Sequence, residues 1–254
     1  MLIAILFAGG LFVGMMLLLE LGRWLGRRRK TKDEEGARAG LGAVEGAVFA
    51  LMGLLVAFTF SGAATRFDAR RQLIVQEANA IGTAWLRLDL LPAAAQPELR
   101  ELFRRYLDSR LATYRKIPDM EAVRTEVARA NALQGQIWLQ ATAASREVAS
   151  PLTAQVIPAL NEMFDVAATH NAVAQIHPPA IIFVMLGVLA LMSSLLAGYA
   201  MAGGQSRSWI HVIGFALILA TTVYVILDLE FPRLGLVRID SFDRILVELR
   251  ATMN

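Results

Sequence analysis

Residues 60–87 read FSGAATRFDARRQLIVQEANAIGTAWLR, and they directly follow the apolar run LMGLLVAF at residues 51–58. No proline interrupts the stretch, and only Gly62 and Gly82 weaken it as a helix. After the first arginine, apolar residues recur in steps of three, four and seven: Phe67, Ile74, Ala78, Ile81, Trp85 and Leu88. This spacing is typical of one face of an α-helix. We therefore expect a membrane-spanning helix to continue unbroken into a charged extramembrane helix.

The composition of the chain is that of a membrane protein. Of its 254 residues, 56% are hydrophobic, and the mean hydropathy is +0.49. Four stretches reach the roughly 20 apolar residues that a membrane-spanning helix needs; they are residues 2–22, 41–63, 180–202 and 209–229. We therefore expect an all-α membrane protein with four transmembrane helices and a helical domain inserted between spans two and three.

This reading divides the chain into four parts. Residues 1–63 hold spans one and two with a basic connecting loop at 23–40, and residues 64–179 form the extramembrane helical insert. Residues 180–230 hold spans three and four, and residues 231–254 form a short amphipathic C-terminal segment. Prolines and caps divide the insert into four helices. Pro92 ends the first helix, Pro97 lies in the first turn of the second, and Pro118 ends the second. Asp119 caps the third helix, and Ser150-Pro151 starts the fourth, which is expected to bend near Pro158. His177-Pro178-Pro179 breaks the chain before span three.

The residue types limit the chemistry. The chain has no cysteine, which excludes disulfides and thiolate metal sites. No two of the three histidines, His170, His177 and His211, share a metal-ligand spacing. No catalytic or nucleotide-binding motif is present. We therefore expect no enzyme activity, no catalytic residue, no metal and no cofactor.

The positive charge of the chain is local. Residues 23–40 carry seven Lys/Arg against three acidic residues, although the net charge of the chain is only +3. A short basic loop of this kind lies beside a lipid bilayer, which makes a nucleic-acid partner unexpected. Because such loops face the cytoplasm, the charges predict an insert outside the cytoplasm.

Two runs of sequence resemble a known family. LMGLLVAFTFSGAATRFDARRQLIVQEANAIGTAWLR and LDLEFPRLGLVRIDSFDRILVELR resemble the bestrophin-like domain family of bacterial membrane proteins, over roughly residues 41–250. More distantly, Thr65-Arg66-Phe67-Asp68-Ala69-Arg70 resembles the pattern after the second span of bestrophin anion channels. This chain lacks the asparagine that usually precedes that pattern, and the dense acidic stretch of calcium-sensing members. The resemblance implies a homo-oligomer in a bacterial cytoplasmic membrane; bestrophins themselves are pentamers. It also implies that span two lines a pore for small ions and that the insert is cytoplasmic.

Four residues of span two are candidates for the lining of such a pore: Glu45, Leu54, Leu55 and Phe58. Glu45 is either a pore carboxylate or an interfacial residue paired with the basic loop. Phe58 is the better candidate for a hydrophobic constriction, because Phe60 points about 200° away around an ideal helix. The alternative is that these aromatic residues face lipid or a neighbouring span.

Charged residues also gather where spans two and four end. They are Arg66, Arg70, Arg71, Asp228 and Glu230. The two acids either form an ion pair with these arginines, hold a cation, or are solvated at the interface. We predict that Arg70 or Arg71 meets Asp228 or Glu230.

Two functions remain open from the sequence. One is a bestrophin-like oligomeric channel or pore with span two lining its axis. The other is a non-conducting membrane assembly or sensing protein whose helical insert binds a partner. A channel needs symmetric copies around a continuous path, whereas the alternative does not.

Overall fold

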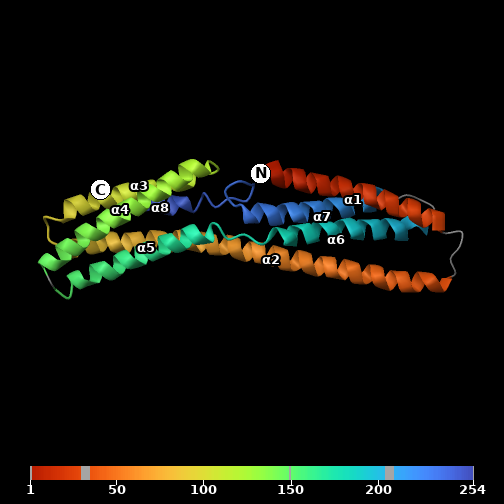
Figure 1. Ribbon diagram of the computed structural model, residues 1–254, viewed down its shortest axis with the longest axis horizontal. Coiled ribbons are helices and arrows are strands. Elements are labelled where there is room, and N and C mark those ends of the chain that lie inside the picture. The colour runs from red at the N-terminus through yellow and green to blue at the C-terminus, as the bar shows by residue number, and fades with distance from the viewer. Residues whose placement is uncertain (1, 30–34, 149, 204–208, 254) are drawn as a thin grey trace. The chain divides into compact units, whose positions relative to one another are not determined.

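The computed structural model describes residues 2–29, 35–148, 150–203 and 209–253. In these residues the chain forms eight α-helices and three short 3-10 helices (Figure 1). The α-helices are α1 (Leu2–Arg29), α2 (Glu35–Arg87), α3 (Gln96–Arg115), α4 (Met120–Glu147), α5 (Val156–Val173), α6 (Ala180–Ala200), α7 (Trp209–Glu230) and α8 (Asp243–Thr252). The 3-10 helices are η1 (Leu88–Leu90), η2 (Thr153–Gln155) and η3 (Met201–Gly203). Four helices, α1, α2, α6 and α7, are long and apolar enough to cross a membrane, which confirms the predicted fold class.

The chain separates into two compact units. The membrane unit combines Met1–Arg66 with His177–Phe231, and the helical unit combines Phe67–Ile176 with Pro232–Asn254. Helix α2 contributes to both units as one continuous helix of 53 residues, as the sequence predicts. The C-terminal segment belongs to the same unit as the insert, so the insert is completed by residues that follow the last span.

In the membrane unit, α1 lies beside α6 and α7 (Figure 1). Two glycines allow the backbones of α1 and α6 to touch. A Cβ atom added at Gly198 would lie 2.0 Å from the Leu19 carbonyl oxygen, and one added at Gly22 would lie 2.0 Å from the Leu195 carbonyl oxygen. Only glycine fits at such a crossing, which is a common way for membrane helices to gain close packing.

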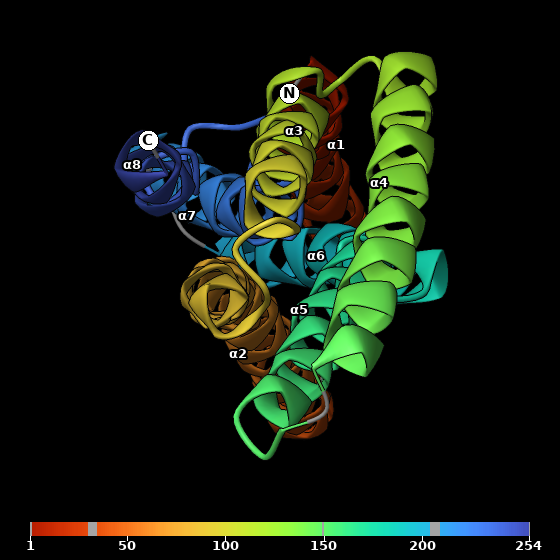
Figure 2. The same ribbon diagram turned by 90° about the vertical axis from the view of Figure 1, so that its left-hand side faces the viewer.

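In the helical unit, α3 lies between α4 and α8 (Figure 2). The apolar faces of α2 and α3 meet in a common core, where Trp85 packs 6.1 Å from Phe103 between ring centres. Polar contacts also join α3 to α4: the Ser109 hydroxyl donates to the Glu126 carbonyl oxygen at 3.0 Å. The fully buried members of the core include Ile74, Ile81, Leu88, Leu99, Phe103, Tyr106, Leu107, Ile137, Leu160 and Leu246.

Most of the predicted helix boundaries in the insert are confirmed. Pro97 lies in the first turn of α3, and Asp119 caps α4 by accepting hydrogen bonds from the backbone of Glu121 and Ala122 at 3.2 and 3.0 Å. The start at Ser150 is different: it leads into η2, and α5 begins only at Val156. Pro158 therefore lies in the first turn of α5, where its missing N–H removes no helical hydrogen bond, and it marks a helix start instead of the expected bend.

Candidate functional site

The membrane-spanning part of α2 makes less contact with the rest of the chain than the other spans do. Of its most apolar 18 residues, 11% are buried, against 22% in α1 and 28% in α6 and in α7. An apolar helix surface of this size needs a lipid or protein neighbour. The part of α2 that does pack against the rest of the chain includes Phe49, whose ring meets Phe215 of α7 edge to face at 6.1 Å.

The four pore candidates do not share one face of α2. Leu54 and Phe58 are 52% and 68% exposed, whereas Leu55 and Glu45 are partly buried. At about 100° per residue, Leu54 and Phe58 lie about 40° apart, while Glu45 lies about 140° from Phe58. The structure therefore brings Leu54 and Phe58 together on the exposed half of the helix and places Glu45 on the opposite half. Phe60 is also exposed, at 43%, on the other edge of that half.

The exposed half of α2 has two unlike flanks. The bulky flank consists of Val44, Leu51 and Phe58, each more than half exposed. The small flank lies about 130° around the helix and consists of exposed Gly46, Ala50, Gly53 and Ala57. A Cβ atom added at Gly46 or Gly53 would meet no atom within 4 Å, so no other part of the described chain covers the small flank at these two glycines. Leu54 lies between the two flanks.

At the end of the membrane unit, α2 is joined to α7 by an ion pair. Arg66 Nε donates to Glu230 Oε1 at 2.8 Å, and a second nitrogen of the same guanidinium also contacts this oxygen. The Glu230 side chain is 1% exposed and that of Arg66 is 31% exposed. His177 Nδ1 lies 3.9 Å from Glu230 Oε2, and its ring stacks on Phe231 at 4.7 Å. Arg66, one of the three candidate arginines, thus pairs with Glu230.

The other junction candidates have contacts of their own. Asp228 is buried, and the Tyr224 hydroxyl donates to it at 3.4 Å. Arg70 donates to the Ile176 carbonyl oxygen at 3.0 Å, and Arg71 pairs with Asp68 at 2.9 Å. The pairing of Arg70 or Arg71 with these acids stays a prediction.

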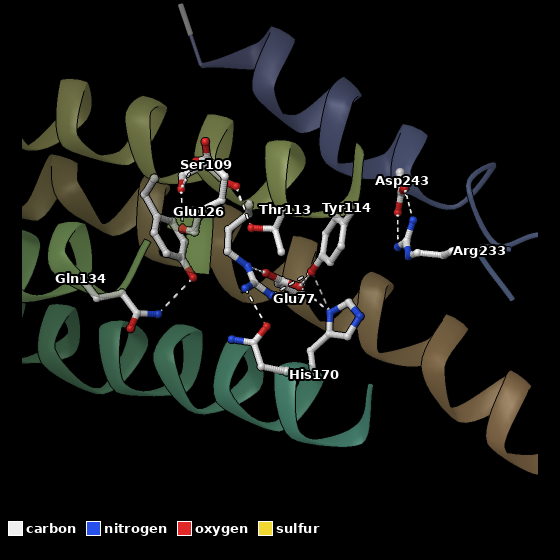
Figure 3. Close-up of polar contacts among 12 residues, drawn as sticks. Glu77, Ser109, Thr113, Tyr114, Glu126, Gln134, His170, Arg233 and Asp243 are labelled. Carbon is white, nitrogen blue, oxygen red and sulfur yellow. Dashed lines mark hydrogen bonds and ion pairs between the residues drawn. The ribbon is translucent and has the colours of Figure 1, made fainter. Parts of the chain in front are cut away.

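The helical unit holds a buried polar cluster that the sequence analysis missed. Glu77 lies at its centre, in the core between α2, α3 and α5 (Figure 3). Arg110 Nε donates to Glu77 Oε1 at 2.5 Å, and the Tyr114 hydroxyl donates to Glu77 Oε2 at 2.7 Å. His170 Nδ1 lies 2.7 Å from the same Glu77 oxygen, and Arg110 also donates to the Asn171 side chain at 2.9 Å. The cluster ties three helices together through one carboxylate.

Electrostatics fix the charge state of this cluster. Burial by itself raises the pKa of Glu77, but the charge of Arg110 and hydrogen bonds with His170 and Arg110 outweigh it and lower the pKa to about 2. Burial, and then the negative charge of Glu77, raise the pKa of Tyr114 well above its usual value. At neutral pH Glu77 is therefore ionised and Tyr114 is a neutral phenol, so the cluster is a structural tie across the unit.

Helical spacing could have revealed these residues. Glu77 follows Ile74 by three positions and precedes Ile81 by four, so it lies on the apolar face of α2. Arg110 lies three positions after Leu107 and four before Tyr114, on the apolar face of α3. A charged residue in the middle of an apolar face needs a buried partner. In the part of the chain that the structure describes, no group of three or more His, Asp or Glu side chains could hold a metal ion.

Known proteins resemble this chain in sequence and in fold. A family model described as Bestrophin-like domain matches residues 11–241. Three solved structures of a bacterial bestrophin homologue from Klebsiella pneumoniae, two of them single-residue variants, share the fold. They have TM-scores of 0.70, 0.68 and 0.65 at 15% identity, and cover 94–95% of this chain and 97–98% of theirs. No curated protein matches the chain.

Proposed function

The chain belongs to the bestrophin-like family, and from this premise we propose that copies of it form a membrane ring whose α2 helices surround an ion-conducting path. The observation that carries the proposal is the exposed half of α2, with a bulky flank on one side and a small flank on the other. The known members of the family are channels rather than enzymes, which favours conduction over catalysis.

The two flanks are complementary when copies of α2 stand side by side around an axis. In a ring, each subunit presents one flank to the neighbour on its left and the other flank to the neighbour on its right. Val44, Leu51 and Phe58 of one copy then fit against Gly46 and Gly53 of the next. Small residues let membrane helices approach closely, so this contact closes the ring without gaps between the helices.

The same arrangement turns Leu54 toward the axis, with Phe58 about 40° away at the edge of the path. Apolar side chains of this size form a hydrophobic constriction, which controls conduction by excluding water. Glu45 lies on the half of α2 that faces its own subunit, so its charge does not line the path. The resemblance to bestrophins supports five subunits and small ions as the conducted species.

The membrane is a bacterial cytoplasmic membrane, and the charges of residues 23–40 favour a helical unit outside the cytoplasm. The chain has no natural cysteine, so single cysteines introduced at Lys30 and Ser109 report on each side. Because Ser109 is buried, exposed Asp108 is a better position for the second label. With an impermeant thiol reagent on whole cells, we expect labelling at Asp108→Cys and none at Lys30→Cys. The opposite pattern places the helical unit in the cytoplasm.

Conduction is tested in planar bilayers with the purified full chain. We expect the natural chain to conduct, and Leu54→Ala and Phe58→Ala to increase the conductance because they widen the constriction. Ile218→Ala is the matched control, since Ile218 is an equally apolar residue of α7 and is 67% exposed in the subunit. If the protein is folded and oligomeric but no variant passes any ion, the non-conducting assembly or sensing protein takes the place of the channel.

The ring itself has a separate test. Gly53→Leu fills the small flank, whereas Gly10→Leu adds the same side chain to an exposed position of α1; an added Cβ meets no atom within 4 Å at either glycine. We expect Gly53→Leu to dissociate the oligomer in mild detergent and Gly10→Leu to leave it intact, as measured by light scattering. An intact oligomer in both variants means that α2 does not form the contact between subunits.

A further inference from the structure

A pocket opens in the helical unit where the end of α3 meets the C-terminal segment. Its volume is about 490 Å³, within the roughly 300–1,000 Å³ of small-molecule sites. The charged residues that line it are Arg115, Arg233, Arg238, Asp240, Asp243 and Arg244. Four arginines against two aspartates leave a formal surplus of two positive charges in a small space.

The two aspartates are already paired. Arg233 binds both carboxylate oxygens of Asp243 at 2.7 and 2.9 Å (Figure 3), and Arg238 pairs with Asp240 at 2.5 Å. Arg115 and Arg244 are exposed, and neither forms an ion pair with any residue that the structure describes. The surplus charge of the pocket therefore resides on these two guanidinium groups.

The back wall of the pocket is held in place from behind. The Arg233 side chain is only 11% exposed and lies 4.5 Å from the centre of the Tyr114 ring. The Tyr114 hydroxyl is fixed by Glu77 and Arg110 in the buried cluster. A wall that does not rearrange lowers the entropic cost of binding a ligand.

We propose that this pocket binds the phosphate monoester of an apolar alcohol, with Arg115 and Arg244 contacting the phosphate. A guanidinium group binds phosphate oxygens in pairs and keeps its charge at every physiological pH. A phosphate monoester carries about −1.5 to −2 charges near pH 7, which matches the surplus of the pocket. Leu111, Ile117 and Val247 also line the pocket and provide an apolar surface for the rest of the ligand.

Such a phosphate has two possible sources. One is a water-soluble alkyl phosphate, and the other is the headgroup of phosphatidic acid, since Arg233 follows the end of α7 at Glu230 by only three residues. The chemistry that Arg115 and Arg244 recognise is the same in both. The proposal does not depend on whether the protein conducts ions.

The experiment uses the full chain in detergent with two probes. Hexyl phosphate is titrated in by calorimetry, and phosphatidic acid is counted on the protein by native mass spectrometry, with phosphatidylcholine as the reference lipid. Each probe is tested on the natural chain, on Arg115→Gln and on Arg244→Gln. Arg105→Gln is the matched control, because Arg105 is an exposed arginine of the same helix α3 outside the pocket. Circular dichroism melting shows that every variant is folded.

We expect saturable binding of at least one probe. Each pocket substitution should weaken this binding about tenfold or more, as for the loss of a charged hydrogen bond. Arg105→Gln should leave the binding unchanged. Binding of hexyl phosphate alone identifies a soluble ligand, and binding of phosphatidic acid alone identifies a lipid. The proposal is overturned if neither probe binds saturably. Equal weakening by Arg105→Gln also overturns it, because general electrostatic attraction then explains the binding.

Discussion

Glu77 and Arg110 form an ion pair sealed inside the helical unit: Arg110 Nε lies 2.5 Å from Glu77 Oε1, and the two side chains are 0% and 1% exposed. Each charge is tolerated in the core only because the other is there, since an unpaired buried charge is costly. The pair joins α2 to α3. The stability of the helical unit therefore depends on a single carboxylate.

We expect Glu77→Ala to lower the free energy of unfolding by about 3–5 kcal/mol, because it leaves Arg110 buried without a counter-charge. Asp89→Ala is the matched control. Asp89 pairs with Arg100 at the surface, where its side chain is 61% exposed, and loss of an exposed pair costs about 0–1 kcal/mol. Denaturant unfolding followed by circular dichroism measures both. Equal effects of the two substitutions would contradict the role given to Glu77.

Acid should destabilise the helical unit through the same carboxylate. The pKa of Glu77 is lowered from 4.5 to about 2 in the folded chain. A lowered carboxyl pKa contributes stability that is fully present above the unfolded value and is lost as the pH falls through the folded value. We expect the melting temperature to fall between about pH 5 and pH 2, with a contribution of about 3 kcal/mol from Glu77. In Glu77→Gln this part of the pH dependence should disappear, and an unchanged pH profile in that variant would disprove the assignment.

The α1–α6 crossing should be sensitive to a single methyl group. In Gly198→Ala the new Cβ would lie 2.0 Å from the Leu19 carbonyl oxygen, so the two helices must move apart. We expect a loss of about 1–3 kcal/mol, as for an overpacked core. Gly214→Ala of α7, where a Cβ meets no atom within 4 Å, should be neutral or stabilising because alanine favours helix. Thermal stability in detergent compares the two, and similar melting temperatures would refute the close crossing.

The Arg66–Glu230 pair should stabilise the membrane unit to an intermediate extent. Arg66→Gln removes the guanidinium group that pairs with Glu230, whose side chain is 1% exposed. The Arg66 side chain itself is 31% exposed. We expect a cost of about 2 kcal/mol, between the values for surface and buried pairs. Asp68→Asn, which breaks the exposed pair with Arg71, should cost less than 1 kcal/mol. A melting temperature of Arg66→Gln as high as that of Asp68→Asn would show that the pair contributes little.

Local signals explain why much of the fold could be predicted. The unbroken spacing from Phe67 to Leu88 predicts the continuation of α2, and Pro97 and Asp119 mark helix starts that the structure confirms. These features depend on the residue itself and its near neighbours in sequence. The start of α5 does not follow from such a signal. Ser150 has cap-like contacts with Thr153, but they open a 3-10 turn before the helix begins.

The contacts within the candidate sites depend on tertiary packing, which periodicity does not encode. Residues 77, 110 and 170 come from three helices, and their pairing follows from how those helices pack. The sequence alone does not tell which half of α2 packs against the rest of the chain, and therefore does not tell that Glu45 and Phe58 lie on opposite halves.

The division of the chain into two interleaved units has a consequence for biosynthesis. Helix α1 is made long before α6, the helix it crosses at Gly198, and ribosomes add roughly 5–20 residues per second. The core of the helical unit is completed later still, because Ile239, Leu246 and Met253 belong to it and are made after the last span, α7. The insert is therefore an incomplete domain while the last two spans enter the membrane. A chain terminated prematurely after α7 would have all four spans, but the apolar core of its insert would be exposed. Exposed apolar surface of this kind is recognised by quality-control proteases.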